Sequence, residues 1–196
     1  ATNLETGVDI TVEGSVKKTG TVALPANIFK EIVSSFTGGG TITLEQTQDT
    51  VLLTGDGVKS TIKTLSAEDF PSIPTPDEVK TKVTIAGNIF RSLISLVAGY
   101  ASPSTVRPEL ASVLIKAQGG VITAVATDSF RLAEKKVTIT GTVPQFSILI
   151  PAKNALSIIE TLPDEEIDIH ADDHQCAFVW KGGRISTRLV SAEYPD

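Results

Sequence analysis

Two histidines and a cysteine are the side chains of this sequence best suited to binding a metal ion or to nucleophilic catalysis. His170 and His174 lie four residues apart in the stretch HADDH, a spacing that suits a zinc ion when both imidazoles share one face of a helix. The stretch falls between two strand-like segments, and a turn does not supply that geometry, so we predict a solvated loop. Cys176 follows in a strand pattern and is interpreted as a small core residue. We predict no metal site and no cofactor.

Two other stretches contain residues found in ligand-binding motifs. Residues 55–60, GDGVKS, contain Gly, Lys and Ser but lack the spacing of a phosphate-binding loop; a hairpin turn explains them better. Residues 164–166, DEE, are acidic but lead into a strand pattern, where such a run is usually a solvated edge. A nucleophile, a base and an orienting acid are not found together. We therefore predict a protein that is not an enzyme.

Composition narrows the class of protein further. Of the 196 residues, 41% are apolar and 20% are charged, which is normal for a globular protein with a hydrophobic core. No apolar run reaches the roughly 20 residues of a membrane helix, and the single cysteine fits a reducing compartment, so we expect a cytoplasmic protein with no membrane partner. The net charge of −6 argues against binding nucleic acid over the whole surface, but it allows one basic face.

The strongest pattern in the sequence is an internal repeat. Residues 24–36 and 150–162 each begin with an apolar residue and Pro-Ala, continue as a helical pattern, and precede three strand-like segments. Both copies then end in Ser-Ala-Glu, an aromatic residue and proline, and the opening ATNLE matches ATDSF at 126–130 on the same diagonal. The matched pairs are Pro25/Pro151 at an offset of 126, Ala1/Ala126 and Ser66/Ser191 at 125, and Pro71/Pro195 at 124.

A constant offset over this length indicates duplication of a domain-sized unit. We predict one complete copy over 75–196 and the latter part of another over 1–74, with a Pro-rich linker at 72–78. Positions 75–125 have no counterpart in the first copy, so we expect the chain to begin inside a domain. The alternative is a half-domain that folds alone, but half of a layered domain would expose its core face.

The complete copy is itself twofold. A strand pattern at 82–87 precedes a helical pattern at 88–101 and three strand-like segments, and a strand at 146–151 opens a second round. The fold class is therefore α+β, with repeated β-α-β-β-β units and two helices packed on antiparallel sheets per domain. The helical patterns are expected to bury Ile28, Phe29, Ile32, Val33 and Phe36; Ile89, Phe90, Leu93, Ile94 and Val97; and Leu156, Ile159 and Leu162.

The predicted helices differ in charge from the rest of the chain. They carry Lys30, Arg91 and Lys153 against Glu31 and Glu160, a net charge of +1, so the remaining residues carry −7. Their other polar residues are mostly small Ser and Asn. Such a face could meet a phosphate backbone loosely through water, although charge alone favours an ordinary solvated helix face.

At this point the motifs are recognisable. VATDSFRLA at 125–133, the two Pro-Ala helix starts, and the endings TLSAEDFP and LVSAEYPD resemble the bacterial DNA polymerase III beta subunit family, the sliding clamps. The resemblance covers the whole chain. It implies the DNA clamp fold, with three similar domains per chain and two chains closing head to tail into a ring around double-stranded DNA. By that resemblance 1–74 is the latter part of domain 1, 75–196 is domain 2, and domain 3 is absent.

The resemblance also implies which residues carry the function. Helices line the hole of the ring, so the DNA-facing positions would be Lys30, Arg91, Arg107 and Lys153. The family often has aromatic residues after the arginine matched by Arg107, where this chain has Pro108 and Glu109. The implied partners are DNA, the polymerase III catalytic subunit, the clamp loader, other proteins with a clamp-binding motif, and a second copy of the full-length chain.

The family also has a pocket for short linear peptides between its second and third domains. The resemblance places the second-domain wall on Leu110, Thr127, Ser129, Phe130, Arg131, Leu132 and Pro195. Ser129-Phe130 differs from the Gly-His of some relatives. Asp128 and Arg131 could also be a local pair that stabilises a turn, and both roles can coexist.

Two other classes of function stay open from the sequence. One is a stand-alone peptide-binding module with no ring and no DNA, which predicts a natural chain of this length. The other is an enzyme with a site around Asp128 and Arg131, which predicts an activity that needs no polymerase. Stimulation of a polymerase, lost when the ring is opened, would separate the clamp from both.

Overall fold

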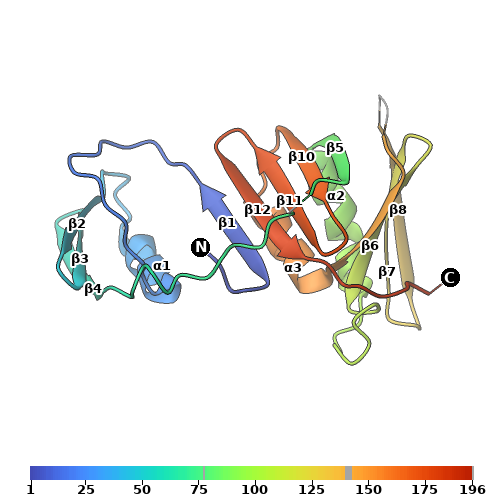
Figure 1. Ribbon diagram of the computed structural model, residues 1–196, viewed down its shortest axis with the longest axis horizontal. Helices are drawn as coiled ribbons and strands as arrows, with labels where there is room; N and C mark the ends of the chain where they lie inside the picture. The colour runs from blue at the N-terminus through green and yellow to red at the C-terminus, as the bar shows by residue number, and fades with distance from the viewer. Residues whose placement is uncertain (77, 140–142, 196) are drawn as a thin grey trace. The chain divides into compact units, whose positions relative to one another are not determined.

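The chain folds into two compact units. A computed structural model describes residues 1–76, 78–139 and 143–195 (Figure 1). The first unit combines residues 1–12 with the chain from residue 73 onward, and the second comprises 13–72. Asp77, inside the predicted linker, and Asp196, at the end of the predicted second domain, lie outside the described residues.

The first unit contains two antiparallel sheets, in the orders β1-β12-β11-β10-β5 and β8-β7-β6-β9. The unit contains two β-α-β-β-β rounds, and the first strand of each round pairs with a strand of the other round. Strand β5 pairs with β10, and β9 pairs with β6. The strands are β1 (Thr6–Ile10), β5 (Thr81–Ala86), β6 (Ser112–Gln118), β7 (Val121–Thr127), β8 (Leu132–Thr138), β9 (Phe146–Pro151), β10 (Glu166–Ala171), β11 (Gln175–Trp180) and β12 (Gly183–Arg188).

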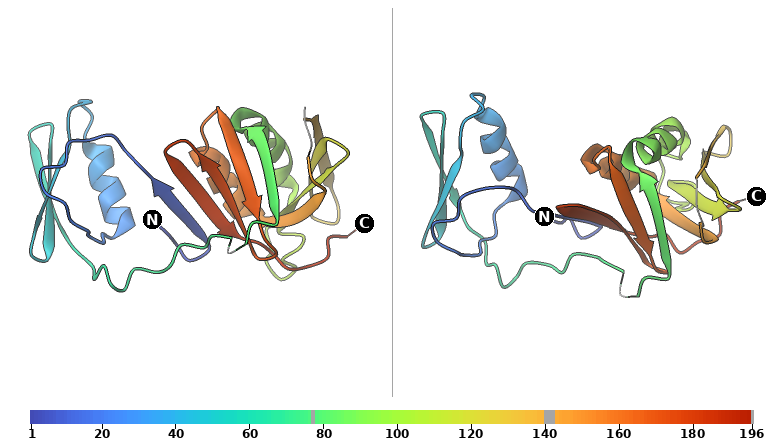
Figure 2. Two further views of the ribbon diagram at one scale, coloured as in Figure 1. Left: turned by 45° about the horizontal axis from the view of Figure 1, so that its top comes forward. Right: turned by 90° about the horizontal axis from the view of Figure 1, so that it is seen from above.

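Two helices, α2 (Gly87–Val97) and α3 (Ala152–Thr161), lie side by side in the first unit (Figure 2). A short 3₁₀ helix, η1 (Ala98–Tyr100), follows α2. Helix α2 contacts β5 of one sheet and β7 and β8 of the other, and α3 likewise contacts strands of both sheets. One core therefore joins both helices to both sheets, as expected for two layers of secondary structure around a shared apolar interior.

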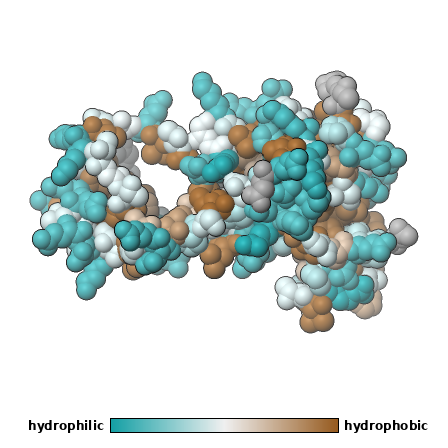
Figure 3. Space-filling model, viewed as in Figure 1, coloured by the Kyte–Doolittle hydropathy of each residue, from teal (hydrophilic) through white to brown (hydrophobic). Residues whose placement is uncertain are grey.

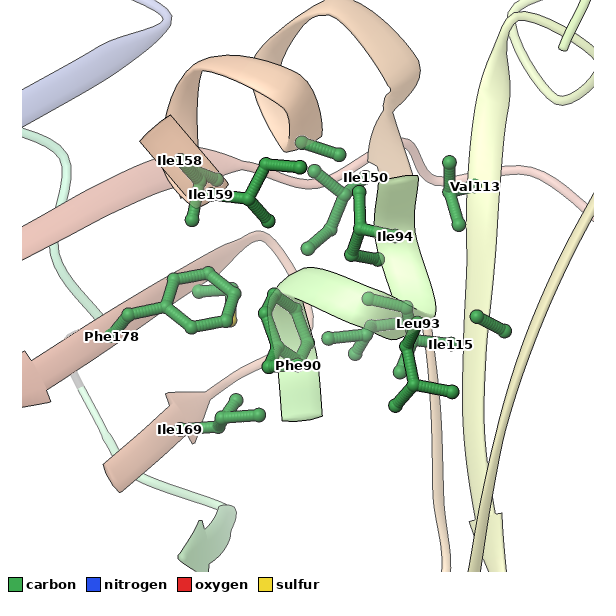
Figure 4. Close-up of a cluster of buried hydrophobic side chains, with 14 of the residues drawn as sticks. Phe90, Leu93, Ile94, Val113, Ile115, Ile150, Ile158, Ile159, Ile169 and Phe178 are labelled. Atoms are coloured by element: carbon green, nitrogen blue, oxygen red, sulfur yellow. The ribbon is translucent and has the colours of Figure 1, made fainter. Parts of the chain in front are cut away.

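The core of the first unit is rich in isoleucine and is centred on α2. The rings of Phe90 and Phe178 meet with their centroids 5.0 Å apart and their planes tilted by 49° (Figure 4), within the range that aromatic pairs prefer. Leu93, Ile94 and Val97 are fully buried on the same face of α2. Their spacing of three and four residues gives one apolar stripe.

Three residues that the helical patterns predicted to be buried are exposed instead. Ile28, Ile89 and Leu156 have exposed fractions of 48%, 38% and 41%, so these predictions were wrong. Each lies beside its helix's apolar stripe, and a helix packed on one side covers a stripe rather than its whole circumference. The predicted helices and strands themselves are confirmed, with ends shifted by a few residues.

The predicted linker packs partly against the first unit. Pro74 is buried, and Ile73 lies on strand β1, where a Cβ added to Gly7 would come within 2.2 Å of Ile73 Cγ2. The absence of a side chain at Gly7 therefore leaves the space that Ile73 fills. The sequence predicted a linker here from its prolines, but it did not show that the segment crosses the sheet.

The second unit is a small helix-on-sheet layer. Helix α1 packs on a three-stranded antiparallel sheet in the order β2-β3-β4, around a core of Val51, Leu53 and Ile62 (Figure 1). No residue of α1 is fully buried, and a unit of this size gains little from its core. Its elements are α1 (Ala26–Ser35), β2 (Thr43–Thr47), β3 (Thr50–Gly55) and β4 (Val58–Lys63).

Candidate functional site

The turn between β7 and β8 is held by a dense set of local hydrogen bonds. Thr127 Oγ1 donates to the Arg131 carbonyl oxygen at 2.6 Å and accepts from the Ser129 N–H at 3.1 Å. Asp128 Oδ1 accepts from the N–H groups of Phe130 and Arg131 at 3.0 and 2.8 Å. Thr and Asp suit such a turn because their short side chains can bond the backbone two or three residues on. Ser129 has a positive φ of 74°, so the turn holds it in the left-handed region.

Arg131 is fixed at the outer side of this turn. Its Nε and Nη2 donate to Asp128 Oδ2 at 3.0 and 2.8 Å, and its guanidinium lies 5.5 Å from the centre of the Tyr100 ring, within cation–π range. The hydrogen bonds from the Arg131 N–H, the Arg131 side chain and the Phe130 N–H lower the pKa of Asp128 from 3.8 to about 2. The predicted turn-stabilising pair is therefore confirmed, and Tyr100 joins it.

Replacing Asp128 by asparagine tests how much the charge of Asp128 contributes to the stability of the folded chain. Asparagine keeps the oxygen that accepts the two backbone N–H groups, but it removes the charge paired with Arg131. Because the folded pKa of Asp128 is depressed, its contribution to stability is present above the unfolded pKa near 3.8 and is lost as the pH falls through about 2. We expect the wild type to be more stable than Asp128→Asn at pH 6, with the difference shrinking between pH 4 and pH 2. Urea unfolding at a series of pH values measures it; a difference independent of pH would contradict this account.

The predicted pocket residues fall into two groups. Ser129, Phe130, Arg131, Leu132 and Pro195 are exposed, whereas Leu110 and Thr127 have exposed fractions of 5% and 9%. Phe130 and Leu132 have exposed fractions of 95% and 65%, and both lie at one end of β8. They form an exposed apolar patch. Two shallow hollows, one on α1 and one at the β11–β12 turn, are lined by none of these seven residues.

The loop after η1 contains Arg107, one of the four residues predicted to face DNA. Arg107 Nε donates to Glu109 Oε1 at 2.8 Å, and the backbone N–H of Glu109 and this arginine lower the pKa of Glu109. Ser102 N–H donates to the Leu110 carbonyl oxygen at 2.8 Å and closes the loop. The charge of Arg107 is therefore partly neutralised by its own loop. Figure 3 shows exposed hydrophobic side chains on the same loop, of which Val106 is 87% exposed.

Arg91 holds the end of the neighbouring helix. Its Nε donates to the Ile159 carbonyl oxygen at 3.0 Å, while Nη2 donates to the Leu162 carbonyl oxygen and Nη1 pairs with Asp164. A cation at these carbonyls satisfies groups that a helix C-terminus leaves unpaired and complements its dipole. This geometry gives Arg91 a structural role, and its contact with DNA stays a prediction.

The other two helix cations are free for a partner. Lys30 on α1 and Lys153 on α3 are exposed, and neither forms an ion pair with any residue that the structure describes. Each is available for loose contact with a phosphate.

The candidate catalytic and metal-ligating residues do not form a site. His170 lies within β10, one residue before its end, and His174 lies in the turn that follows, so the two share no helical face. Burial raises the pKa of Cys176, which makes it a poor nucleophile. Among the described residues no group of His, Cys, Asp and Glu is placed to hold a metal ion, and no helix is long and apolar enough to span a bilayer. Residues 56 and 57 form the hairpin turn predicted for GDGVKS, with φ values of 49° and 76°.

The start of the chain contains a second copy of the β7–β8 turn. Thr2 Oγ1 donates to the Thr6 carbonyl oxygen and accepts from the Leu4 N–H, and Asn3 Oδ1 accepts from the N–H groups of Glu5 and Thr6. Leu4 has a φ of 77°, as Ser129 has 74°. The weak sequence match of ATNLE to ATDSF is therefore a structural repeat.

Comparison with protein families covers both parts of the chain. The model for the N-terminal domain of the DNA polymerase III beta subunit matches residues 1–74, and the model for its central domain matches residues 84–196. The chain belongs to the DNA polymerase III beta subunit family. The resemblance inferred from the repeated motifs is thereby confirmed.

Relatives of the DNA polymerase III beta subunit family support the assignment along the chain. The beta sliding clamp of Synechococcus elongatus is 25% identical over 100% of this chain and 54% of its own length. That of Micrococcus luteus is 28% identical over 97% of this chain and 62% of its own length. The chain thus spans little more than half the length of these relatives.

Solved structures of beta subunits have the same fold. The DNA polymerase III subunit beta of Pseudomonas aeruginosa superposes with a TM-score of 0.88 at 24% identity, over 100% of this chain and 54% of that one. The sliding clamp of Bacillus subtilis gives 0.86 at 24% identity, over 99% and 54%. The predicted α+β clamp fold is confirmed.

Proposed function

We propose that this chain is part of a DNA polymerase sliding clamp, which acts in DNA replication as a processivity factor. The observation that carries the proposal is the succession of two beta subunit domain matches in one chain, N-terminal then central. The proposed division is the latter part of domain 1 over 1–74 and domain 2 over 75–196. Strand β1 pairs with β12, so in this division the first strand of the 1–74 segment extends a sheet of domain 2.

The proposed mechanism is retention by topology rather than by tight binding. A ring formed by two full-length chains would enclose double-stranded DNA, and Lys30 and Lys153 would face it with small polar neighbours. Weak contacts suit a protein that must slide, because each phosphate contact adds affinity that falls with salt. Arg91 and Arg107 are proposed as further DNA-facing positions, each already engaged within the protein.

The proposed partners follow from the same role. The patch at the β7–β8 turn, with Leu110 and Pro195, would form one wall of a peptide site for the polymerase III catalytic subunit, the clamp loader and other proteins with a clamp-binding motif. An exposed apolar patch with a few polar anchors suits an extended peptide. A cytoplasmic location and a non-catalytic role belong to the same proposal.

The deciding experiment uses the protein as its own gene encodes it. We expect a chain about twice as long as this one, a dimer in light scattering, and longer products from a polymerase extending a primer on circular DNA. The 196-residue chain should give no such stimulation. A native monomer of 196 residues would favour the peptide-binding module, and stimulation by the short chain alone would contradict retention by a ring.

A further inference from the structure

Strand β1 contributes little apolar burial of its own to the sheet that it joins. It lies at the edge of the five-stranded sheet and pairs there with β12. Of its five residues only Gly7 is buried, and glycine has no side chain to remove from water. Val8 packs partly against the core, while Asp9 and Ile10 are exposed. Such an edge strand would open readily unless another part of the chain held it.

The segment that begins at Ile73 crosses the face of this sheet that points away from the core. Ile73 lies over Gly7 on β1, and the Lys80 N–H donates to the Ala171 carbonyl oxygen at 3.0 Å, where β10 pairs with β5. Four strand spacings of about 4.8 Å separate β1 from β5. The seven steps from residue 73 to residue 80 span at most about 25 Å. The segment therefore takes a direct path over β12, β11 and β10 (Figures 1 and 2).

A row of small residues lies under this path. Gly7, Ser186 and Ala177 are neighbours on β1, β12 and β11, and they alternate with core residues, so they face away from the core. Even so, Ser186 and Ala177 are 0% and 3% exposed, and Nε2 of His170, the next residue in the row, is also buried. Residues on the outer side of a sheet are buried only when something covers them. The crossing segment accounts for that cover.

The internal repeat separates what the strand requires from what the crossing segment requires. The residue that follows the two copies of the turn is Gly7 in β1 but Leu132 in β8, and Leu132 is 65% exposed. Gly7 does not have a positive φ, so its backbone conformation allows other residues. A Cβ at Gly7 would lie 2.2 Å from Ile73 Cγ2 and 3.2 Å from Ile73 Cβ. The contact with Ile73 is therefore what requires glycine.

We propose that residues 73–80 form a strap that locks β1 onto β12, with Ile73 over Gly7 as its latch; the inference goes beyond the proposed function and does not depend on it. Leaving β12 breaks the strand pairing and the strap contact together, so β1 opens less often than its own burial would allow. The latch also fixes the register. A shift by one residue would turn Thr6 or Val8 toward Ile73, and both side chains are larger than the space that the contact leaves.

Hydrogen exchange in the full 196-residue chain tests the lock. The amides of residues 7–11 are followed by NMR, with those of β11 as the internal reference. Gly7→Ala should raise the exchange rates of residues 7–11 about 10-fold or more, because the added Cβ pushes Ile73 away, and should leave β11 unchanged. Gly14→Ala is the matched control. A Cβ at Gly14 meets no atom within 4 Å, so this variant should change neither set of rates.

Ile73→Ala removes the side chain that meets the added Cβ. By itself it should raise the exchange rates of residues 7–11 about 3-fold or more, and adding Gly7→Ala to it should change them by less than about 2-fold. No effect of Gly7→Ala in the wild type, or the same effect in both backgrounds, would overturn the latch. An equal rise at β11 would mean that the whole unit opens together and that β1 is not locked separately.

Discussion

Replacing Gly87 by alanine is expected to destabilise the first unit by about 3 kcal/mol or more. A Cβ added at Gly87 would lie 1.9 Å from the Pro163 carbonyl oxygen and 3.2 Å from that of Glu165. Both neighbours are backbone atoms, so no side chain can move aside. The Gly87 N–H also donates to the Glu165 carbonyl oxygen at 2.8 Å, which holds the two segments at this distance. Relieving the overlap would therefore displace the start of α2.

Urea unfolding followed by the fluorescence of Trp180 measures this loss. The chain has one tryptophan, which lies on β11 and so reports on the first unit. Gly99→Ala is the matched control, because a Cβ at Gly99 meets no atom within 4 Å; we expect it to change stability by no more than about 0.5 kcal/mol. If Gly87→Ala and Gly99→Ala change the free energy of unfolding by the same amount, α2 does not approach the backbone of residues 163–165 as closely as described.

Truncating Phe90 to alanine should cost about 3–5 kcal/mol. The side chain is 1% exposed and packs on the Phe178 ring in the centre of the core (Figure 4). Removing it takes away buried apolar area and leaves a cavity that Phe178 and its neighbours on both sheets can fill only in part. The free energy of unfolding of a native protein is commonly about 5–15 kcal/mol, so this one substitution would remove a large part of the total stability.

The same Phe-to-Ala substitution at an exposed position is the control for the loss of stability at Phe90. Phe130→Ala removes an identical side chain that is 95% exposed, and its effect should stay within about 0.5 kcal/mol. Guanidinium unfolding of both variants, monitored at Trp180, gives the two values under one condition. Similar losses for both variants would show that α2 does not join the core as described.

Much of the architecture was predictable from the sequence because duplication repeats its signals. The Pro-Ala helix starts, the strand patterns and the Ser-Ala-Glu endings recur at a nearly constant offset, which identified the domain-sized unit and its family. Local turn chemistry was predictable for the same reason: Thr127 and Asp128 bond their own backbone, and such bonds depend only on residues a few positions apart.

Other features depend on contacts between segments distant in the sequence. The periodicity of α1 and α3 placed Ile28 and Leu156 in the core, but how much of a helix is covered depends on the layers around it. Arg91 was predicted from the family to face DNA, and the structure brings its guanidinium to the C-terminal carbonyls of α3. Neither outcome follows from the residues adjacent to these positions.

Gly87 and Phe130 show the same division between sequence and structure. In the repeat Gly87 corresponds to Ala26 and Ala152, so the pattern alone would allow alanine there, and only the approach of the Pro163 backbone excludes it. Phe130 differs from its counterpart Glu5, and only equal hydrogen bonding in the two turns shows that the difference does not serve the fold. The sequence determined the elements, their repetition and the family, because these depend on local propensity and periodicity. The tertiary structure decided which side chains were buried, paired or left exposed, because that depends on the segments that pack beside them.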